Sequence, residues 1–240
     1  MWSDWQSKVI NSLPNFCGDG EYVAQRYEHH LFEDIAQRTI KQAKIYDLDG
    51  KEKDIKFGAL PVETRACGKV TRMWLETNRE IDFLSQNLNL KNINILDIGA
   101  GYGRLAVVLS KEVKSYSTVD AVEISTSVCR YYTKLHNADV RVMNLTDLLV
   151  GHKTNSLPQY DLAINIHSWS ECSYNNVKEW LDTLKELSIP YLFTVTHGNN
   201  YQSWDGGNLK SLFEEKYTLV ATQPDGISNC PYNLWKRTKP

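Results

Sequence analysis

The 240-residue sequence lacks the features that mark membrane-spanning, secreted and metal-stabilised proteins. No stretch approaches about 18 consecutive apolar residues, so we expect no membrane-spanning helix. The first residues, Met1–Trp5, include no basic start and lead into no apolar run, which argues against a secretory signal. The five cysteines are scattered, without a CxxC pair or a zinc-ligand spacing. We therefore expect reduced thiols and a cytoplasmic location.

An excess of positive charge is also missing. Lys and Arg total 27 and Asp and Glu total 29, which gives a formal net charge of −2. Because a general nucleic-acid binder usually carries a basic excess, nucleic acid is not an expected partner, although a local basic patch would fit these totals. The sequence gives no indication of an oligomeric state. It is rich in aromatic residues, with seven Trp and thirteen Tyr, and flat rings suit sugar or base ligands as well as core packing.

From residue 92 onward, apolar strand patterns alternate with helical ones. The expected strands are 93–98, 116–120, 140–143, 161–166, 191–196, 217–222 and 232–237, and the expected helices are 104–111, 127–136, 177–187 and 209–215. Such alternation predicts a Rossmann-like α/β fold, whose seven-stranded, mostly parallel sheet carries helices on both faces. No helix separates the last two strands, so we expect them to pair antiparallel.

The first part of the chain has a different texture. Val23, Tyr27, Leu31 and Ile35 recur every four residues, which predicts a helix over about 21–45. A second long helix fits Lys69 to Leu88. We therefore divide the chain into an N-terminal helical extension, 1–90, and an α/β domain, 91–240.

A glycine-rich loop between the first strand and first helix of this domain is the strongest motif. It reads Asp97-Ile98-Gly99-Ala100-Gly101-Tyr102-Gly103. Glycines let the backbone turn sharply and approach a ligand, and ligands of open α/β sheets bind outside the carboxyl ends of the strands. Arg104 stands where a dinucleotide fingerprint needs Gly or Ala, and the Gly-Lys-Ser/Thr of a P-loop is absent.

An acid follows the second strand. Asp120 ends that strand and could accept both hydroxyls of a ribose, and Glu123 is the alternative if the strand runs three residues longer. Together, the glycine pattern, the preceding Asp97 and this later acid resemble the class I S-adenosylmethionine-dependent methyltransferases. The resemblance implies S-adenosylmethionine as cofactor. The implied contacts are Gly99, Ala100, Gly101, Tyr102 and Gly103 for its amino-acid part, Asp120 for its ribose, and Asn144 and Leu145 in the segment 143–147 for its adenine. Asp97 would hold either the loop or the ammonium group of the cofactor.

Two histidines lie where the fourth and fifth strands end. His167 follows the fourth strand and His197 the fifth, and these strand ends would face the transferred methyl group in such a fold. Histidine is the usual general base, and a weakly acidic alkyl hydroxyl benefits from one. We therefore take His167 as the base and His197 as its rival, and expect turnover to fall as pH drops through the histidine range. Glu171 could orient His167 or bind a substrate hydroxyl. A purely structural role for either histidine is the alternative.

A closer resemblance rests on three stretches, 99–106, 120–132 and 166–171, the last reading Ile-His-Ser-Trp-Ser-Glu. They resemble the sugar O-methyltransferase family over roughly residues 65–205. The family implies a sugar or glycoside hydroxyl as acceptor and an N-terminal helical lid. Trp169 is then either a stacking wall for substrate or a lid over the core. Tyr201 and Trp204, in a long polar loop, are candidate substrate contacts, and a merely solvated loop would also explain them.

Other functions fit parts of the pattern. A divalent cation is conceivable but not favoured, because no compact acid cluster offers several oxygen ligands. A small-molecule or protein N-methyltransferase is the first alternative. The Asp/Asn-Pro-Pro-Tyr/Phe block of many enzymes that methylate base nitrogens is absent after the fourth strand, where 165–168 reads Asn-Ile-His-Ser. A non-catalytic, cofactor-binding partner subunit is the second alternative, which the histidines argue against.

Overall fold

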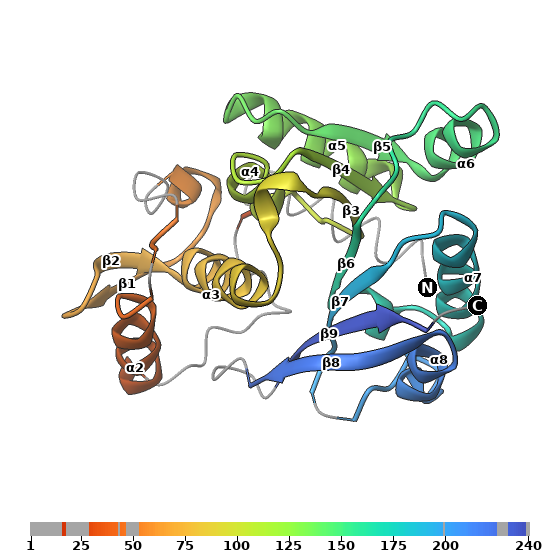
Figure 1. The fold of residues 1–240 in the computed structure, drawn as a ribbon. Coiled ribbons are helices and arrows are strands. Elements are labelled where there is room, and N and C mark those ends of the chain that lie inside the picture. The colour runs from red at the N-terminus through yellow and green to blue at the C-terminus, as the bar shows by residue number, and fades with distance from the viewer. Residues whose placement is uncertain are drawn as a thin grey trace.

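The computed structural model describes residues 16–17, 29–42, 44–46, 53–198, 200–224 and 230–238. Its centre is a seven-stranded sheet with the order β5-β4-β3-β6-β7-β9-β8 (Figure 1). The strands are β3 (Asn94–Ile98), β4 (Ser115–Asp120), β5 (Arg141–Asn144), β6 (Leu162–Ile166), β7 (Tyr191–Val195), β8 (Tyr217–Gln223) and β9 (Tyr232–Arg237). The first five run parallel, whereas β9 pairs antiparallel with both β7 and β8. The predicted seven-stranded, mostly parallel sheet is therefore confirmed, including the antiparallel last pair.

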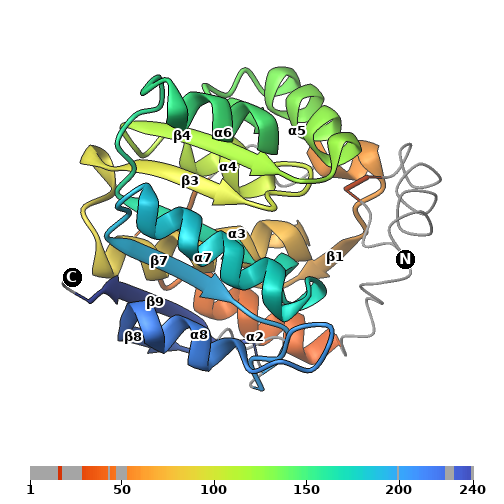
Figure 2. The ribbon, with the colours of Figure 1, turned by 90° about the vertical axis from the view of Figure 1, so that its right-hand side faces the viewer.

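Helices cover both faces of the sheet (Figures 1 and 2). On one face lie α3 (Arg72–Asn87), α4 (Arg104–Leu109) and α5 (Glu123–Leu135), and on the other lie α6 (Leu145–Lys153), α7 (Tyr174–Glu186) and α8 (Leu209–Lys216). Neighbouring side chains of a strand point to opposite faces, so each strand contributes side chains to the hydrophobic clusters on both faces of the sheet. In β3, Ile95 packs in the cluster that includes α3 and α4, and Leu96 packs in the cluster that includes α7 and α8.

A small hairpin precedes α3, and its last three residues, 69–71, fall where the sequence predicted helix. Its strands are β1 (Pro61–Thr64) and β2 (Gly68–Thr71), and Gly68 at their turn has a φ of 68°. The predicted helix start at Lys69 is therefore wrong. The helix begins at Arg72 because the Thr71 side chain caps it, accepting a hydrogen bond of 3.2 Å from the Trp74 N–H.

Other helices also differ from expectation. Helix α2 spans His29–Thr39 rather than continuing to 45, and the predicted helical residues 21–28 lie outside the described part of the chain. Helix α5 begins at Glu123, four residues earlier than expected. Helix α6 was not predicted. It begins after Asn144, whose side chain forms a capping box with Asp147.

The described N-terminal elements pack against the first face. Helix α2 meets α3 through Ile35 and Trp74, and the 3₁₀ turn η3 (Lys53–Phe57) lies beside Phe16. The buried Cys17 and Ala59 join Val107 of α4 and Tyr132 of α5 in one cluster. No helix among the described residues combines the length and apolarity needed to cross a bilayer.

Candidate functional site

The glycine loop connects β3 to α4 and uses its three glycines differently. All have positive φ, at 70° for Gly99, 57° for Gly101 and 93° for Gly103. A Cβ on Gly99 would lie 2.2 Å from the Ser168 Oγ, and one on Gly103 would lie 2.9 Å from the Cys129 Sγ. A Cβ on Gly101 would meet no atom of the described residues within 4 Å. The outer glycines therefore permit close packing, whereas the middle one leaves open space where a ligand can approach the backbone.

Arg104 fixes the end of this loop to α3. Its guanidinium donates two hydrogen bonds of 2.7 and 2.8 Å to the Glu80 carboxylate, and a third of 2.7 Å to the Thr77 hydroxyl. Glu80 is almost fully buried, so this two-pronged pair holds the start of α4 rigidly. From the sequence alone, Arg104 is only an obstacle to dinucleotide binding. The three-residue spacing of Thr77 and Glu80 on a helix was the signal that could have found the pair.

Two acidic residues lie near the carboxyl ends of β3 and β4, at this edge of the sheet. Asp97 is buried and accepts a hydrogen bond of 2.8 Å from the Tyr116 hydroxyl, and burial raises its pKa to about 7. Asp120 ends β4 as expected, and its Oδ1 accepts the Val122 N–H at 2.8 Å. Burial raises the pKa of Asp120 to about 6. Since α5 begins at Glu123, the strand does not run on to that residue, and its side chain is exposed.

His167 follows β6 in a strained conformation, with φ 65° and ψ −39°. Its ring stacks on that of His197, with centroids 4.6 Å apart and planes 10° apart. Its Nδ1 is buried and has no hydrogen-bond partner within the described part of the chain. Burial, aided by His197 and the nearby Arg104 and Arg72, lowers the pKa of His167 to about 3. The ring is therefore neutral near pH 7 and carries an unsatisfied polar atom, a combination typical of functional sites.

Glu171 contacts the other histidine. Its Oε1 lies 3.4 Å from the His197 Nε2, and both side chains are about half exposed. The expectation that Glu171 orients His167 is wrong in this geometry. The 3₁₀ turn η5 (Ser168–Glu171) carries the carboxylate past His167 toward the end of the neighbouring strand β7. The charge of Glu171 also raises the pKa of Asp120, so η5 faces the end of β4 as well.

Asn165 ties the histidine turn to the glycine loop, a role that the sequence argument missed. Its Nδ2 donates to the Ile98 carbonyl at 2.9 Å and to the Ser168 Oγ at 2.6 Å. Its Oδ1 accepts the Trp169 N–H at 3.1 Å. A buried amide at the end of an otherwise apolar strand was the available signal, because such a group needs partners.

The predicted aromatic contacts fall in different environments. Trp169 is 1% exposed and packs against Phe213 in the core, so the stacking-wall hypothesis is wrong and the lid over the core is correct. Tyr201 is half-buried against the same core cluster. The Trp204 side chain is 59% exposed, and the backbone N–H of this residue donates a hydrogen bond of 3.0 Å to the Cys172 carbonyl.

The remaining predicted contacts lie around these groups. Tyr102 of the loop packs edge-on against Tyr132, with ring centroids 5.0 Å apart. The Asn144 side chain is engaged in capping α6, and Leu145 begins that helix, 38% exposed. Within the described ranges, no three His, Cys, Asp or Glu side chains are grouped to hold a metal ion.

Comparisons with known proteins identify a family model and solved structures of similar fold. A family model described as a methyltransferase domain matches residues 65–216. The structure is similar to magnesium protoporphyrin IX methyltransferase (ChlM) from Synechocystis PCC 6803 with bound SAM, at 12% identity and a TM-score of 0.52, covering 90% of this chain and 99% of that one. It is also similar to the PH0226 protein from Pyrococcus horikoshii OT3, at 14% identity and a TM-score of 0.52, and the match covers 65% of this chain and 86% of that one. Among curated proteins, none matches the chain by sequence.

Proposed function

From the premise that this chain belongs to the methyltransferase-domain family, we propose that it methylates a hydroxyl oxygen of a sugar or glycoside. S-adenosylmethionine is the cofactor, as expected from the glycine loop and its flanking acids. Its role when bound is to supply an electrophilic methyl group. The observation that carries the oxygen assignment is His167, a strained and neutral imidazole whose buried Nδ1 has no hydrogen-bond partner among the described residues.

The residues at the edge of the sheet suit such a cofactor. The open space beside Gly101 lets the backbone receive the amino-acid part, and Asp120 is held by the Val122 N–H in a position to accept ribose hydroxyls. Asp120 and Glu171 place carboxylates at this edge, which favours a ligand carrying positive charge. Asn144 and Leu145, where β5 meets α6, would flank the adenine.

His167 is proposed to accept the proton of the acceptor hydroxyl. An imidazole with a pKa of about 3 is a weak base, but an oxygen becomes strongly acidic as it gains a methyl group. The proton would leave the acceptor oxygen for a ring nitrogen while the new carbon–oxygen bond forms and the sulfur–methyl bond of the cofactor breaks, with S-adenosylhomocysteine as the leaving product. Because the buried environment disfavours imidazolium, His167 would then release this proton readily to water. His197, held near Glu171, would position the stacked ring and the acceptor.

The sugar assignment rests on the motif at 166–171 and on the loop that carries Tyr201 and Trp204. Trp204 offers an exposed ring, and Asp205 beside it keeps its charge because hydrogen bonds from the Ser203 hydroxyl and the Tyr174 N–H lower its pKa. An exposed ring next to a carboxylate is suited to a polyhydroxyl ligand, which needs both stacking and hydrogen-bond acceptors.

A product assay tests this function. The full chain would be incubated with S-adenosylmethionine and free, nucleotide-linked and oligomeric sugars and glycosides, and the products analysed by mass spectrometry. We expect a gain of one methyl group on a sugar oxygen. Methylation of an amine or of RNA, with no reaction on any sugar, would overturn the acceptor assignment. Binding of RNA with a steep salt dependence would point to phosphate recognition instead.

A further inference from the structure

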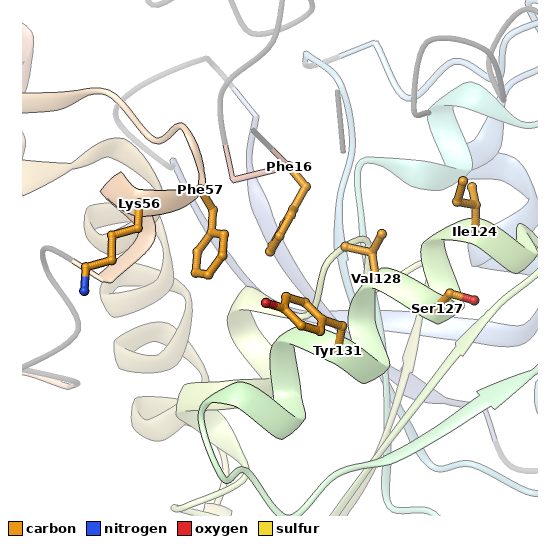
Figure 3. Close-up of a pocket in the computed structure, with 7 residues that line it drawn as sticks. All are labelled: Phe16, Lys56, Phe57, Ile124, Ser127, Val128 and Tyr131. Atoms are coloured by element: carbon orange, nitrogen blue, oxygen red, sulfur yellow. The ribbon is translucent and has the colours of Figure 1, made fainter. Parts of the chain in front are cut away.

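A groove outside the site described above lies along the outer side of α5. Its volume is about 510 Å³, within the range of small-molecule sites. It is lined by Phe16, Lys56, Phe57, Ile124, Ser127, Val128 and Tyr131 (Figure 3). The segments that form it are far apart in sequence: the N-terminal residues contribute one wall, and four positions on one side of α5 contribute the other.

Aromatic rings dominate the groove. Phe16 and Phe57 stack with centroids 4.9 Å apart, and both present an edge-on contact to Tyr131, at 6.3 and 6.5 Å. In Figure 3 the three rings converge, whereas Lys56 and Ile124 stand at opposite ends. Tyr131 is 56% exposed, which leaves much of its surface uncovered. A flat apolar group can therefore bury ring surface here without displacing buried polar atoms.

The polar groups of the groove are few. Among the described residues that line it, Lys56 carries the only charge, and Ser127 and Tyr131 supply the only side-chain hydroxyls. A bare sugar needs a hydrogen-bond partner for most of its hydroxyls, so these two groups are too few for it. One cation at the end of an aromatic groove instead suits an anionic substituent on a planar ring.

We propose that this groove binds a planar aromatic ligand that carries an acidic group, with the ring against Phe57 and Tyr131 and the acid toward Lys56. The groove begins at Ile124, four residues after Asp120, and Tyr131 lies seven residues further along, about 10 Å of helix. Two sources share this chemistry: the aromatic substituent of a glycoside acceptor, or a separate effector molecule. The first source rests on the proposed function, and the binding site itself does not.

Direct binding to the full chain tests the site with two fluorescent probes. 8-Anilinonaphthalene-1-sulfonate carries the acid, and N-phenyl-1-naphthylamine has the same rings without it. Val128→Asp places a charge in the groove and should weaken sulfonate binding about tenfold or more. Val150→Asp is the matched control, because Val150 is an exposed helical valine outside the groove, and it should change binding less than about twofold. Equal effects of the two substitutions would overturn the proposal.

Two further variants sharpen the chemistry. Lys56→Glu should weaken binding of the sulfonate probe about tenfold and change the affinity for the neutral probe by less than about twofold. Tyr131→Ala, at an exposed position, should weaken both probes and serves if Val128→Asp fails to fold. Loss of both probes to the same extent in Lys56→Glu would contradict the acidic group. Displacement of the probe by saturating S-adenosylhomocysteine would overturn the proposal, because the groove would then be part of the cofactor site.

The two sources are separated by kinetics. If the acceptor supplies the ring, a 4-carboxyphenyl glycoside should have a higher kcat/KM than the methyl glycoside, and Val128→Asp should remove that preference. If a separate effector binds instead, the wild type should show no preference for the 4-carboxyphenyl glycoside. The probe should still bind the wild type and should not bind Val128→Asp. Both outcomes support the groove as a site. If the protein binds the probe but methylates no sugar, the groove is still a binding site, and only the proposed function is refuted.

Discussion

The glycine loop and the turn after β6 meet at one edge of the sheet, but their polar groups are satisfied very differently. The Arg104 guanidinium next to the loop makes three hydrogen bonds to α3, and the loop glycines adopt conformations that glycine accepts without strain. His167 occupies a strained conformation and has a buried nitrogen without a partner in the described part of the chain. This difference suits a first region that holds a ligand in a fixed pose and a second region whose His167 ring offers a polar nitrogen for a reaction.

Replacing His167 should produce the largest effect. His167→Ala should lower kcat by about 10²–10⁴-fold, the usual size of a general-base contribution. Affinity for S-adenosylhomocysteine, measured by calorimetry, should barely change, because the glycine loop and Asp120 are untouched. His167→Gln should restore little, since an amide cannot take a proton. Near-full turnover in His167→Ala together with its loss in His197→Ala would move the base to the end of β7.

The pH profile of the wild type sharpens this assignment. A base with a pKa of about 3 stays unprotonated through the ordinary histidine range, so the initial expectation that turnover falls there does not apply to His167 in this structure. We expect kcat at saturating substrates to show no histidine-like fall between about pH 8 and 5. A fall in that interval that disappears in His197→Ala would identify His197 as the base.

Breaking the Arg104–Glu80 pair should destabilise the rigid region. Arg104→Met removes the guanidinium that pairs with the buried Glu80 carboxylate, and breaking such a buried pair typically costs about 3–5 kcal/mol. The melting temperature should fall by roughly 2–4 °C per kcal/mol. The double substitution Arg104→Met/Glu80→Met should recover much of this loss, because no charge is left unpaired. A double variant as unstable as the sum of its parts would show that the pair itself is not the cause.

Asp120→Ala should weaken cofactor binding more than it affects folding. Hydrogen bonds to a charged group contribute about 1.5–3 kcal/mol, which corresponds to roughly a 10–100-fold rise in Kd for S-adenosylhomocysteine. Calorimetry would measure it, with Glu123→Ala as the control, because that exposed acid lies in the first turn of α5. A larger effect of Glu123→Ala would exchange the roles of the two acids.

The smallest effect concerns Asp97 and pH. Its pKa in the folded state, about 7, lies above its ordinary value of 3.8, so its contribution to stability is present at low pH and is lost as pH rises through about 7. Asp97→Asn stays neutral and can still accept the Tyr116 hydroxyl. In the cofactor-free protein, the melting temperature of the variant relative to that of the wild type should be roughly 5–10 °C higher at pH 8 than at pH 5. An equal difference at both pH values would contradict the raised pKa.

Local patterns were enough to predict the sheet and its parallel core. The run from Asn94 to Ile98 is apolar because both of its faces are covered, and such runs alternating with helices leave few arrangements open. The helix starts at Arg72 and Leu145 were missed because caps on Thr71 and Asn144 decided them, and neither cap interrupts an apolar pattern. That β9 lies between β7 and β8 could not be read locally, since it depends on long-range pairing.

The sequence by itself determined the glycine loop, the acid at the end of β4 and the two histidines at neighbouring strand ends. Each depends on residues close together in the chain, within one strand and the turn that follows it. Only the tertiary structure decided that Glu171 faces His197, that Trp169 is core, and that Arg104 is locked by α3. These outcomes depend on which side chains meet across separate elements, and burial, which sets the pKa of His167 and Asp97, arises only when those elements pack.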